Sequence, residues 1–252
     1  MPSARLYLVR HGETDENRNG IIQGHLDTEL NEQGIAQSEI TAQAMESIPL
    51  TEVWSSDLQR AVKTAQIIAE KHPGLSFVST KKLRERGLGK IEGSHHTQAS
   101  KILSAFPGGI DPSAEAFEVL YKRLMSWWDT DILGLTKRPV QSLDLPNHQN
   151  ENEKQHHILI VSHGGFIGTV VKQLLDTGRI SDSSSSPAMT QMKWSLNTSI
   201  TTIDIDESGE GTLVKYADIG HMLDAVREGR IVEKNVDVLL AEYTRAAGGE
   251  TL

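Results

Sequence analysis

The chain has 252 residues, of which 37% are hydrophobic and 23% are charged, and its formal net charge is -9. This size and composition suit a globular protein whose core needs no cross-links, and the lack of cysteine excludes disulfides, thiolate catalysis and cysteine-ligated zinc. The net negative charge disfavours nucleic acids and anionic membranes as partners.

The first third of the chain alternates predicted strands and helices. Residues 6–10 (LYLVR) form a short apolar run with a glycine two positions later, which is typical of a buried strand. Apolar residues at helical spacing predict a helix over residues 31–48, with Asn31 as its N-cap. Residues 52–55 are the second predicted strand, and a helix capped by Asp57 follows through residue 71.

Residues 76–80 are the third predicted strand, and the charged, glycine-punctuated segment 83–93 is a predicted loop. The longest helical pattern covers residues 114–133. Its expected buried stripe consists of Phe117, Leu120, Leu124, Trp127 or Trp128, and Ile132. A buried strand over 157–162 leads into a helix ending near residue 175, and residues 199–206 and 212–219 are two strands of an expected hairpin.

Alternating strands and helices predict an α/β fold, a three-layer α/β/α sandwich with a mainly parallel central sheet. We expect one domain over residues 1–252, decorated by polar insertions at about 136–155 and 178–190. The second insertion begins with the serine-rich string GRISDSSSSP.

Two predicted strands end in similar sequences. The first runs into Arg10-His11-Gly12, and the strand over 157–162 runs into His163-Gly164-Gly165. Ligand sites of open α/β sheets lie beyond the carboxyl ends of the strands. We therefore expect both histidines at one edge of the sheet.

Two charged residues lie near other predicted strand ends. Arg60 falls near a helix start, where a guanidinium and the helix amides can hold a phosphate. Glu85 lies in the loop after the third strand and is placed to donate and accept a proton. Taken alone, each is better explained as a solvated surface charge.

The order of several strings is more specific than any single residue. RHGETDENRNGIIQG, SSDLQRAVKTAQ, LRERGLGKIEG and VSHGG follow one another along the chain. This set closely resembles the histidine phosphatase superfamily, which has the phosphoglycerate mutase-like fold, and is most similar to its small fungal phosphatases. The resemblance runs from Leu6 to about Leu175 and resumes over residues 196–201.

The resemblance implies roles for individual residues. His11 matches the histidine that becomes phosphorylated, and Glu85 matches the proton donor. The remaining catalytic residues that it implies are Arg10, Arg60 and His163, and the substrate-binding residues are Asn17, Gln23, Gly24 and Gly164. Glu115 and Arg123 fall where relatives have a Gly-Glu-Ser element followed by arginine, but the element here is Ser-Ala-Glu-Ala and implies no role. His221 resembles a late histidine of some relatives and is given no role.

These groups suit hydrolysis of a phosphomonoester without a metal or other cofactor. Two arginines and a protonated His163 can stabilise the charge on the equatorial oxygens of the transition state. A neutral His11, held by a hydrogen bond from its other nitrogen to a backbone carbonyl, can attack phosphorus. Glu85 would protonate the leaving oxygen and then activate water. The expected substrate is a small phosphorylated metabolite such as a sugar phosphate.

Three other functions fit parts of this sequence. A mutase needs an enclosing segment after the Glu85 region, and none is apparent in the sequence. A non-catalytic binding protein on this fold usually lacks one of the core groups, and here all are present. A histidine-ligated metal hydrolase is suggested by His95-His96 and His156-His157, but neighbouring residues of a strand point to opposite faces, and neither pair has a metal-ligand spacing with a carboxylate.

The N-terminal sequence lacks the apolar stretch of a secretory signal. No apolar segment approaches the ~20 residues of a membrane-spanning helix. A cysteine-free chain suits a reducing compartment. We therefore expect a cytoplasmic protein, with the nucleus as a second compartment, and no membrane or nucleic-acid partner. The sequence makes no prediction of the oligomeric state.

Overall fold

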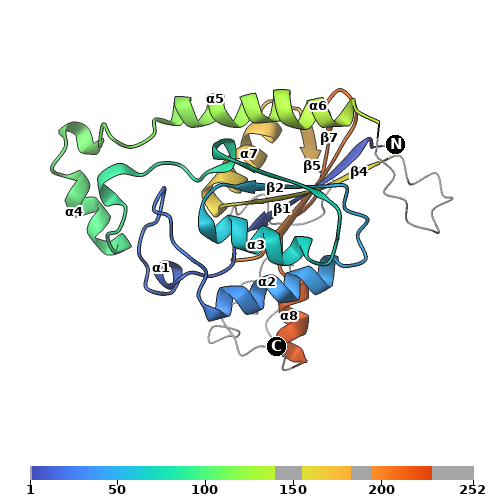
Figure 1. Ribbon diagram of the computed structural model, residues 1–252. Coiled ribbons are helices and arrows are strands. Elements are labelled where there is room, and N and C mark those ends of the chain that lie inside the picture. The colour runs from blue at the N-terminus through green and yellow to red at the C-terminus, as the bar shows by residue number, and fades with distance from the viewer. Residues whose placement is uncertain (1, 140–154, 183–194, 229–252) are drawn as a thin grey trace, which may run out of the picture.

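The computed structural model describes residues 2–139, 155–182 and 195–228 (Figure 1). Its centre is a sheet with the strand order β3-β2-β4-β1-β6-β7-β5. The strands are β1 (Ala4–Arg10), β2 (Glu52–Ser56), β3 (Ser76–Thr80), β4 (His156–Ser162), β5 (Ile180–Asp182), β6 (Ile200–Ile205) and β7 (Gly211–Asp218). Of these, β6 alone runs against the others. The predicted α/β fold with a mainly parallel sheet is confirmed.

Helices cover both faces of the sheet. The longer ones are α2 (Glu32–Met45), α3 (Gln59–Ala69), α5 (Phe117–Trp127), α7 (Gly164–Asp176) and α8 (Gly220–Arg227), and the short ones are α1 (Asp15–Arg18), α4 (Ala99–Leu103) and α6 (Leu133–Thr136). In Figure 1, α5, α6 and α7 lie on one side of the sheet, and α2 and α3 lie on the other. The sandwich therefore has the three expected layers.

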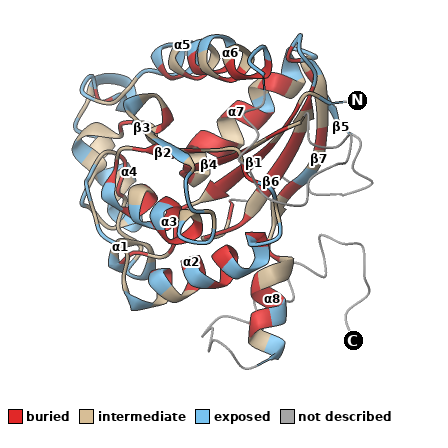
Figure 2. Cartoon of the chain, turned by 45° about the vertical axis from the view of Figure 1, so that its right-hand side comes forward, coloured by how far each residue is buried: buried red, intermediate tan, exposed pale blue. Residues whose placement is uncertain are grey.

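The apolar pattern of the central strands explains these layers. In β1, Leu6 and Leu8 belong to the core under α5 and α7, whereas Tyr7 and Val9 belong to the core under α2 and α3. Successive side chains of a strand point to opposite faces, so a strand that is apolar throughout is buried on both faces. Figure 2 shows the central strands mostly buried.

The hydrogen bonds and register confirm several local predictions. Asn31 caps α2 through a hydrogen bond from the backbone N–H of Gly34 to its side chain, at 2.8 Å. The expected hairpin is formed by β6 and β7, which pair antiparallel. The segment around Glu85 is mainly a loop, and it includes the 3-10 turns η1 (Lys81–Leu83) and η2 (Gly89–Ile91).

Other local predictions are wrong. Asp57 does not cap α3, which has Leu58 at its N-cap and no capping side chain; Asp57 instead forms a two-pronged ion pair with Arg84, at 2.6 and 2.8 Å. Phe117 is 49% exposed rather than buried. A π-helical turn, η5 (Trp128–Ile132), follows α5, and both Trp127 and Trp128 are buried in the core.

The two predicted insertions lie largely outside the described residues. Within the second, Ile180–Asp182 forms β5 beside β7, so the expectation of a loop is wrong there. Ile180 is buried in the core, and this burial outweighs the polar composition of its neighbours. The assignment of residues 1–252 to one domain stays a prediction. None of the helices in the described part of the chain is long and apolar enough to cross a membrane.

Candidate active site

The two histidine motifs meet at the carboxyl edge of the sheet. β1 and β4 are parallel neighbours, with Arg10 opposite Ser162 in the register. The next residue of each strand is a histidine, and the ring centroids of His11 and His163 lie 5.2 Å apart. The backbone N–H of His11 donates to the carbonyl of Ser162 at 3.0 Å. The expectation that both histidines open onto one edge is confirmed.

The ring of His11 is fixed from both sides. Its Nδ1 lies 2.7 Å from the carbonyl oxygen of Gly12, and because a carbonyl only accepts, this contact assigns the proton to Nδ1. The Nε2 atom then keeps its lone pair and accepts from Nε of Arg60 at 3.3 Å. Burial, followed by the charges of Arg60 and Arg10, lowers the pKa of His11 well below its usual value. His11 is therefore neutral at physiological pH.

Gly12 permits the close approach that places His11. A Cβ atom at this position would lie 2.4 Å from the carbonyl oxygen of Gly34 in α2, so any larger residue would separate the strand end from the helix. The N–H of Gly12 also donates to Oγ1 of Thr64 in α3, at 3.0 Å. The turn after β1 is thus anchored on both helices of that face.

Arg60 links His11 to the loop before α2. It comes from the first turn of α3 and is 1% exposed. Its Nη1 donates to the carbonyl of Leu26 at 2.6 Å, and its Nη2 donates to that of Gly24 at 2.9 Å. Burial lowers its pKa to about 10, so the guanidinium stays charged at neutral pH. Gln23, beside Gly24, accepts from Oγ1 of Thr28 at 2.6 Å.

Two buried nitrogens in the cavity lack partners. Nη1 of Arg10 donates to the carbonyl of Ser195 at 2.5 Å, and Nε2 of His163 lies 2.9 Å from Oγ of Ser56. Nε of Arg10 and Nδ1 of His163 have no hydrogen-bond partner among the described residues. Buried polar groups are normally paired, so these two nitrogens are placed to bind a ligand.

The prediction of a protonated His163 is wrong. Burial lowers the pKa of its ring well below the usual value, and the charge of Arg60 adds to this effect. A charged ring would be desolvated beside a guanidinium, and both effects oppose protonation. His163 is therefore neutral at physiological pH and can act as a hydrogen-bond donor, not as a cation.

The carboxylate of Glu85 lies against the start of α7. Its Oε2 accepts from the N–H of Gly165 at 2.9 Å, and its Oε1 accepts from the N–H of Arg86 at 2.8 Å. A Cβ atom at Gly165 would lie 2.6 Å from Oε1 of Glu85. The glycine after Gly164 thus allows the carboxylate to approach the helix terminus.

A cavity of about 640 Å³ joins these groups. All nine residues predicted for the site line it: Arg10, His11, Asn17, Gln23, Gly24, Arg60, Glu85, His163 and Gly164. Apolar side chains form part of the remaining wall, namely Ile21, Ile22, Leu88, Phe117 and Leu120, and Arg86 and His96 also contribute. The sequence therefore identified residues that the fold brings into one cavity.

Asn197 and Ser56 support the site and were not predicted. Asn197 donates from Nδ2 to the carbonyl of His11 at 2.9 Å and to Oδ1 of Asn17 at 3.3 Å. Ser56 contacts His163, as described above. Both lie inside strings that carry the family resemblance, LNTSIT and SSDL, and this position was the available signal for them.

His95, His96 and His221 have structural partners. Nδ1 of His95 lies 2.7 Å from Oγ1 of Thr97, and Nδ1 of His96 lies 3.1 Å from the carbonyl of Gly20. In the described part of the chain, no group of three or more histidine, aspartate or glutamate side chains could hold a metal ion. His221 contacts Oγ1 of Thr41 in α2 at 3.1 Å, outside the cavity lining.

The histidine pair on β4 is divided between the two faces of the sheet, as expected for neighbouring strand residues. Nε2 of His156 lies 2.9 Å from the carbonyl of Arg138. Nδ1 of His157 lies 3.1 Å from the hydroxyl of Tyr7. The two rings therefore have separate partners.

Comparison with known proteins gives the family. The model of the histidine phosphatase superfamily (branch 1) matches residues 6–219. The chain belongs to the histidine phosphatase superfamily. It is 28% identical to a probable phosphatase of Schizosaccharomyces pombe over 90% of this chain and 99% of that protein, and 32% identical to phosphoglycerate mutase-like protein 4 of Arabidopsis thaliana over 87% of each chain.

A solved structure agrees with this assignment. The fold is similar to that of phosphoserine phosphatase from Entamoeba histolytica, solved in complex with 3-phosphoglyceric acid, with a TM-score of 0.58 and 29% identity. The match covers 87% of this chain and 99% of that one. This member of the histidine phosphatase superfamily is a phosphatase.

Proposed function

We propose that this phosphatase is a metal-independent phosphomonoesterase that forms a covalent phosphohistidine at Nε2 of His11. The observation that carries the proposal is the state of His11: its Nδ1 is bound to a backbone carbonyl, and its neutral Nε2 lies beside the guanidinium of Arg60. A neutral imidazole with a fixed ring is ready to act as a nucleophile.

In the first half-reaction, the lone pair of Nε2 forms the N–P bond while the P–O bond to the leaving group breaks. The proton of a protonated Glu85 carboxyl moves to the leaving oxygen, so the product is an alcohol. The guanidiniums of Arg10 and Arg60 bind the equatorial phosphoryl oxygens, whose charge they neutralise. With the Ser56 hydroxyl donating to Nε2 of His163, the Nδ1–H of that ring donates to the same oxygens.

In the second half-reaction, water attacks the phosphoryl group of His11. Glu85, now a carboxylate, accepts a proton from this water, and the N–P bond breaks to release inorganic phosphate. His11 regains its neutral form, and Glu85 regains the proton that it lost. The same carboxyl serves both steps because the leaving oxygen and the attacking water occupy the same side of phosphorus.

The expected substrate is a small phosphorylated metabolite. A cavity of about 640 Å³ is of the size that encloses small ligands, and the named activity of the Entamoeba relative, a phosphoserine phosphatase, is of this class. Transfer to a second hydroxyl, as in a mutase, is the alternative, and the two differ in whether water or an alcohol receives the phosphoryl group. The cytoplasmic location expected from the sequence stays a prediction.

Phosphate release tests this proposal. Wild type and His11→Ala are compared on a generic phosphomonoester and a small panel of sugar phosphates, with EDTA present throughout. We expect wild-type turnover to survive chelation and to vanish in His11→Ala. Loss of wild-type turnover on chelation would indicate a metal enzyme, and turnover only when an acceptor alcohol is added would favour the mutase.

A further inference from the structure

One guanidinium binds three backbone carbonyls of the loop that carries Glu85. This loop belongs to no strand, so its backbone carbonyls need partners elsewhere. His25 and Ser162 provide two of them: Nε2 of His25 lies 2.8 Å from the carbonyl oxygen of Glu85, and Oγ of Ser162 donates to that of Leu83 at 2.7 Å. Arg123 of α5 provides the most. Its Nη1 donates to the carbonyl oxygen of Lys82 at 2.9 Å and to that of Arg84 at 2.8 Å, and its Nη2 donates to that of Glu85 at 3.2 Å.

Glu115 binds the rest of the same guanidinium. Nε of Arg123 donates to Oε1 of Glu115 at 3.0 Å, and Nη2 donates to Oε2 at 2.8 Å. An arginine has five N–H donors, and these five hydrogen bonds use them all. Glu115 also contacts the loop beyond Glu85: its Oε2 accepts from the N–H of Gly87 at 3.2 Å, and its own N–H donates to the carbonyl of Gly87 at 2.8 Å.

The pair is fixed and charged. The side chains of Arg123 and Glu115 are only 17% and 13% exposed. Burial alone would raise the pKa of Glu115, but its hydrogen bonds with Arg123 and the charge of that arginine outweigh burial and lower the pKa. A forked, two-pronged ion pair has a defined geometry that a single lysine nitrogen cannot reproduce. The backbone on both sides of Glu85 is therefore tied to one rigid group.

We propose that Arg123 and Glu115 are positioning residues that hold the carboxyl of Glu85 at the leaving oxygen. The inference rests on the proposed function, in which Glu85 moves the proton. Neither residue is among the described residues that line the cavity, so both act through Glu85. A small displacement of a catalytic group steeply lowers its contribution to the reaction rate.

The leaving group separates positioning from general structural damage. An alkyl phosphate needs a proton on its leaving oxygen. By contrast, 2,4-dinitrophenyl phosphate releases a stable anion, and its leaving oxygen needs almost no help from a general acid. The ratio kcat/KM reports the steps through transfer to His11 and excludes hydrolysis of the phosphoenzyme. A misplaced Glu85 therefore lowers kcat/KM for the alkyl ester selectively.

We expect Arg123→Met and Glu115→Gln to lower kcat/KM for glycerol phosphate by about 10²-fold, the lower end of the contribution of general acid catalysis, and to change the value for 2,4-dinitrophenyl phosphate far less. Arg123→Lys should not restore the alkyl ester, because the charge remains but the fork is lost. Adding Arg123→Met to Glu85→Gln should cause little further loss, because both changes remove the same contribution.

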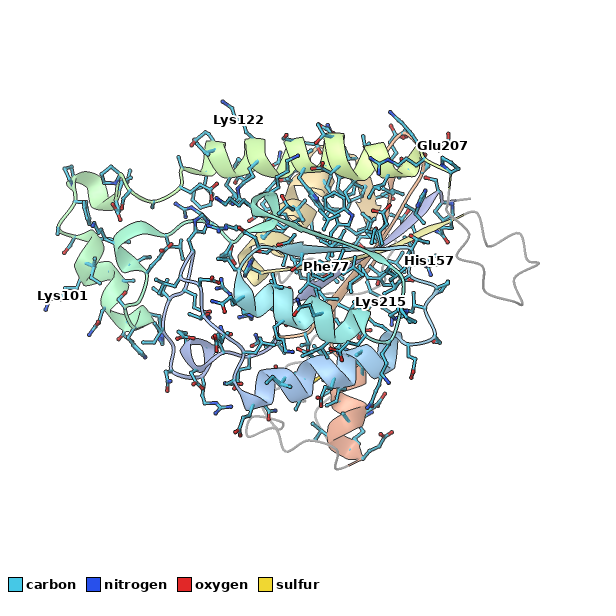
Figure 3. The ribbon with its side chains drawn as sticks, in the orientation of Figure 1. Phe77, Lys101, Lys122, His157, Glu207 and Lys215 are labelled. Atoms are coloured by element: carbon cyan, nitrogen blue, oxygen red, sulfur yellow. The ribbon has the colours of Figure 1, made fainter. Side chains whose placement is uncertain are left out.

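Two variants serve as controls. Lys122→Met removes a cation from the same helix, where the side chain points outward (Figure 3), and Arg5→Met breaks a forked ion pair with Asp204 at the far end of β1. Neither should alter the ratio between the two substrates. Thermal melting of each variant identifies unfolded protein, and if Arg123→Met does not fold, the near-isosteric Glu115→Gln still decides the question.

The outcomes are distinct. Suppose that Glu85→Gln lowers kcat/KM for the alkyl ester selectively. Equal losses of kcat/KM on both substrates in folded Glu115→Gln and Arg123→Met would then overturn the positioning role. A Glu85→Gln variant that is indifferent to the leaving group would instead show that the proposed function has the wrong proton donor.

Discussion

Replacing Gly165 with alanine tests the placement of Glu85 without removing any functional group. The new Cβ atom would lie 2.6 Å from Oε1 and 2.9 Å from Oε2 of Glu85. Ordinary contact begins at 3.4 Å, so the carboxyl must move by about 0.8 Å. Gly165 lies in the first turn of α7 with no positive φ, so alanine suits the backbone itself.

The expected result is a loss of activity without a loss of stability. A displacement approaching 1 Å can cost about 10²-fold in rate, and we expect this loss in kcat/KM for an alkyl phosphate, measured by phosphate release. Alanine favours a helix over glycine by up to ~1 kcal/mol, so the melting temperature should not fall far. Gly134→Ala in α6 is the matched control, because its Cβ would meet no atom within 4 Å.

Wild-type kcat/KM for the alkyl phosphate in a folded Gly165→Ala variant would refute this reasoning. The carboxyl of Glu85 would then not need the position against the start of α7. Equal losses for alkyl and 2,4-dinitrophenyl phosphate would also count against it, because the displaced carboxyl matters only where the leaving oxygen needs a proton.

Three further predictions follow from the structure. Asn197→Ala removes the hydrogen bond to the carbonyl of His11, worth about 1 kcal/mol, and should lower kcat/KM roughly fivefold in phosphate release. Arg60→Lys keeps the charge but loses the fork, and should cost about 10²-fold in the same assay. The third concerns stability. Burial lowers the pKa of His221 to about 4, against an ordinary ~6.5 in the unfolded chain. Below pH 6.5 the unfolded state binds a proton that the native state does not, so wild type loses stability as the pH falls. The share of His221 in this loss is about 2 kcal/mol by pH 5, so in denaturant unfolding His221→Gln should lose less stability than wild type by that amount between pH 7 and pH 5.

The elements that position the site were predictable because their signals are local. β1 and β4 are short runs of apolar residues that end in histidine and glycine, and the ends of parallel neighbours in a sheet must meet. The family strings then supplied Arg60 and Glu85, whose charges alone did not distinguish them from surface residues. All the predicted site residues line the cavity for these reasons.

The features that were missed depend on contacts between distant parts of the chain. Asn197 lies 186 positions from His11 in the sequence, and its local apolar and polar pattern does not predict the hydrogen bond between them. Asp57 was expected to cap a helix, but its carboxylate instead accepts two hydrogen bonds from Arg84. The charge of His163 was misjudged because its pKa depends on burial and on Arg60, which only the folded chain brings together.

Trapping the phosphoenzyme tests the central claim most directly. The enzyme is mixed with a monoester labelled in its phosphoryl group, in the presence of EDTA, and quenched in alkali within the first turnover. We predict label on the wild-type protein that is stable to alkali and released by acid, as a phosphoramidate is, and none on His11→Asn. Turnover by His11→Asn at the wild-type rate, or wild-type label that survives acid, would contradict a phosphohistidine at His11.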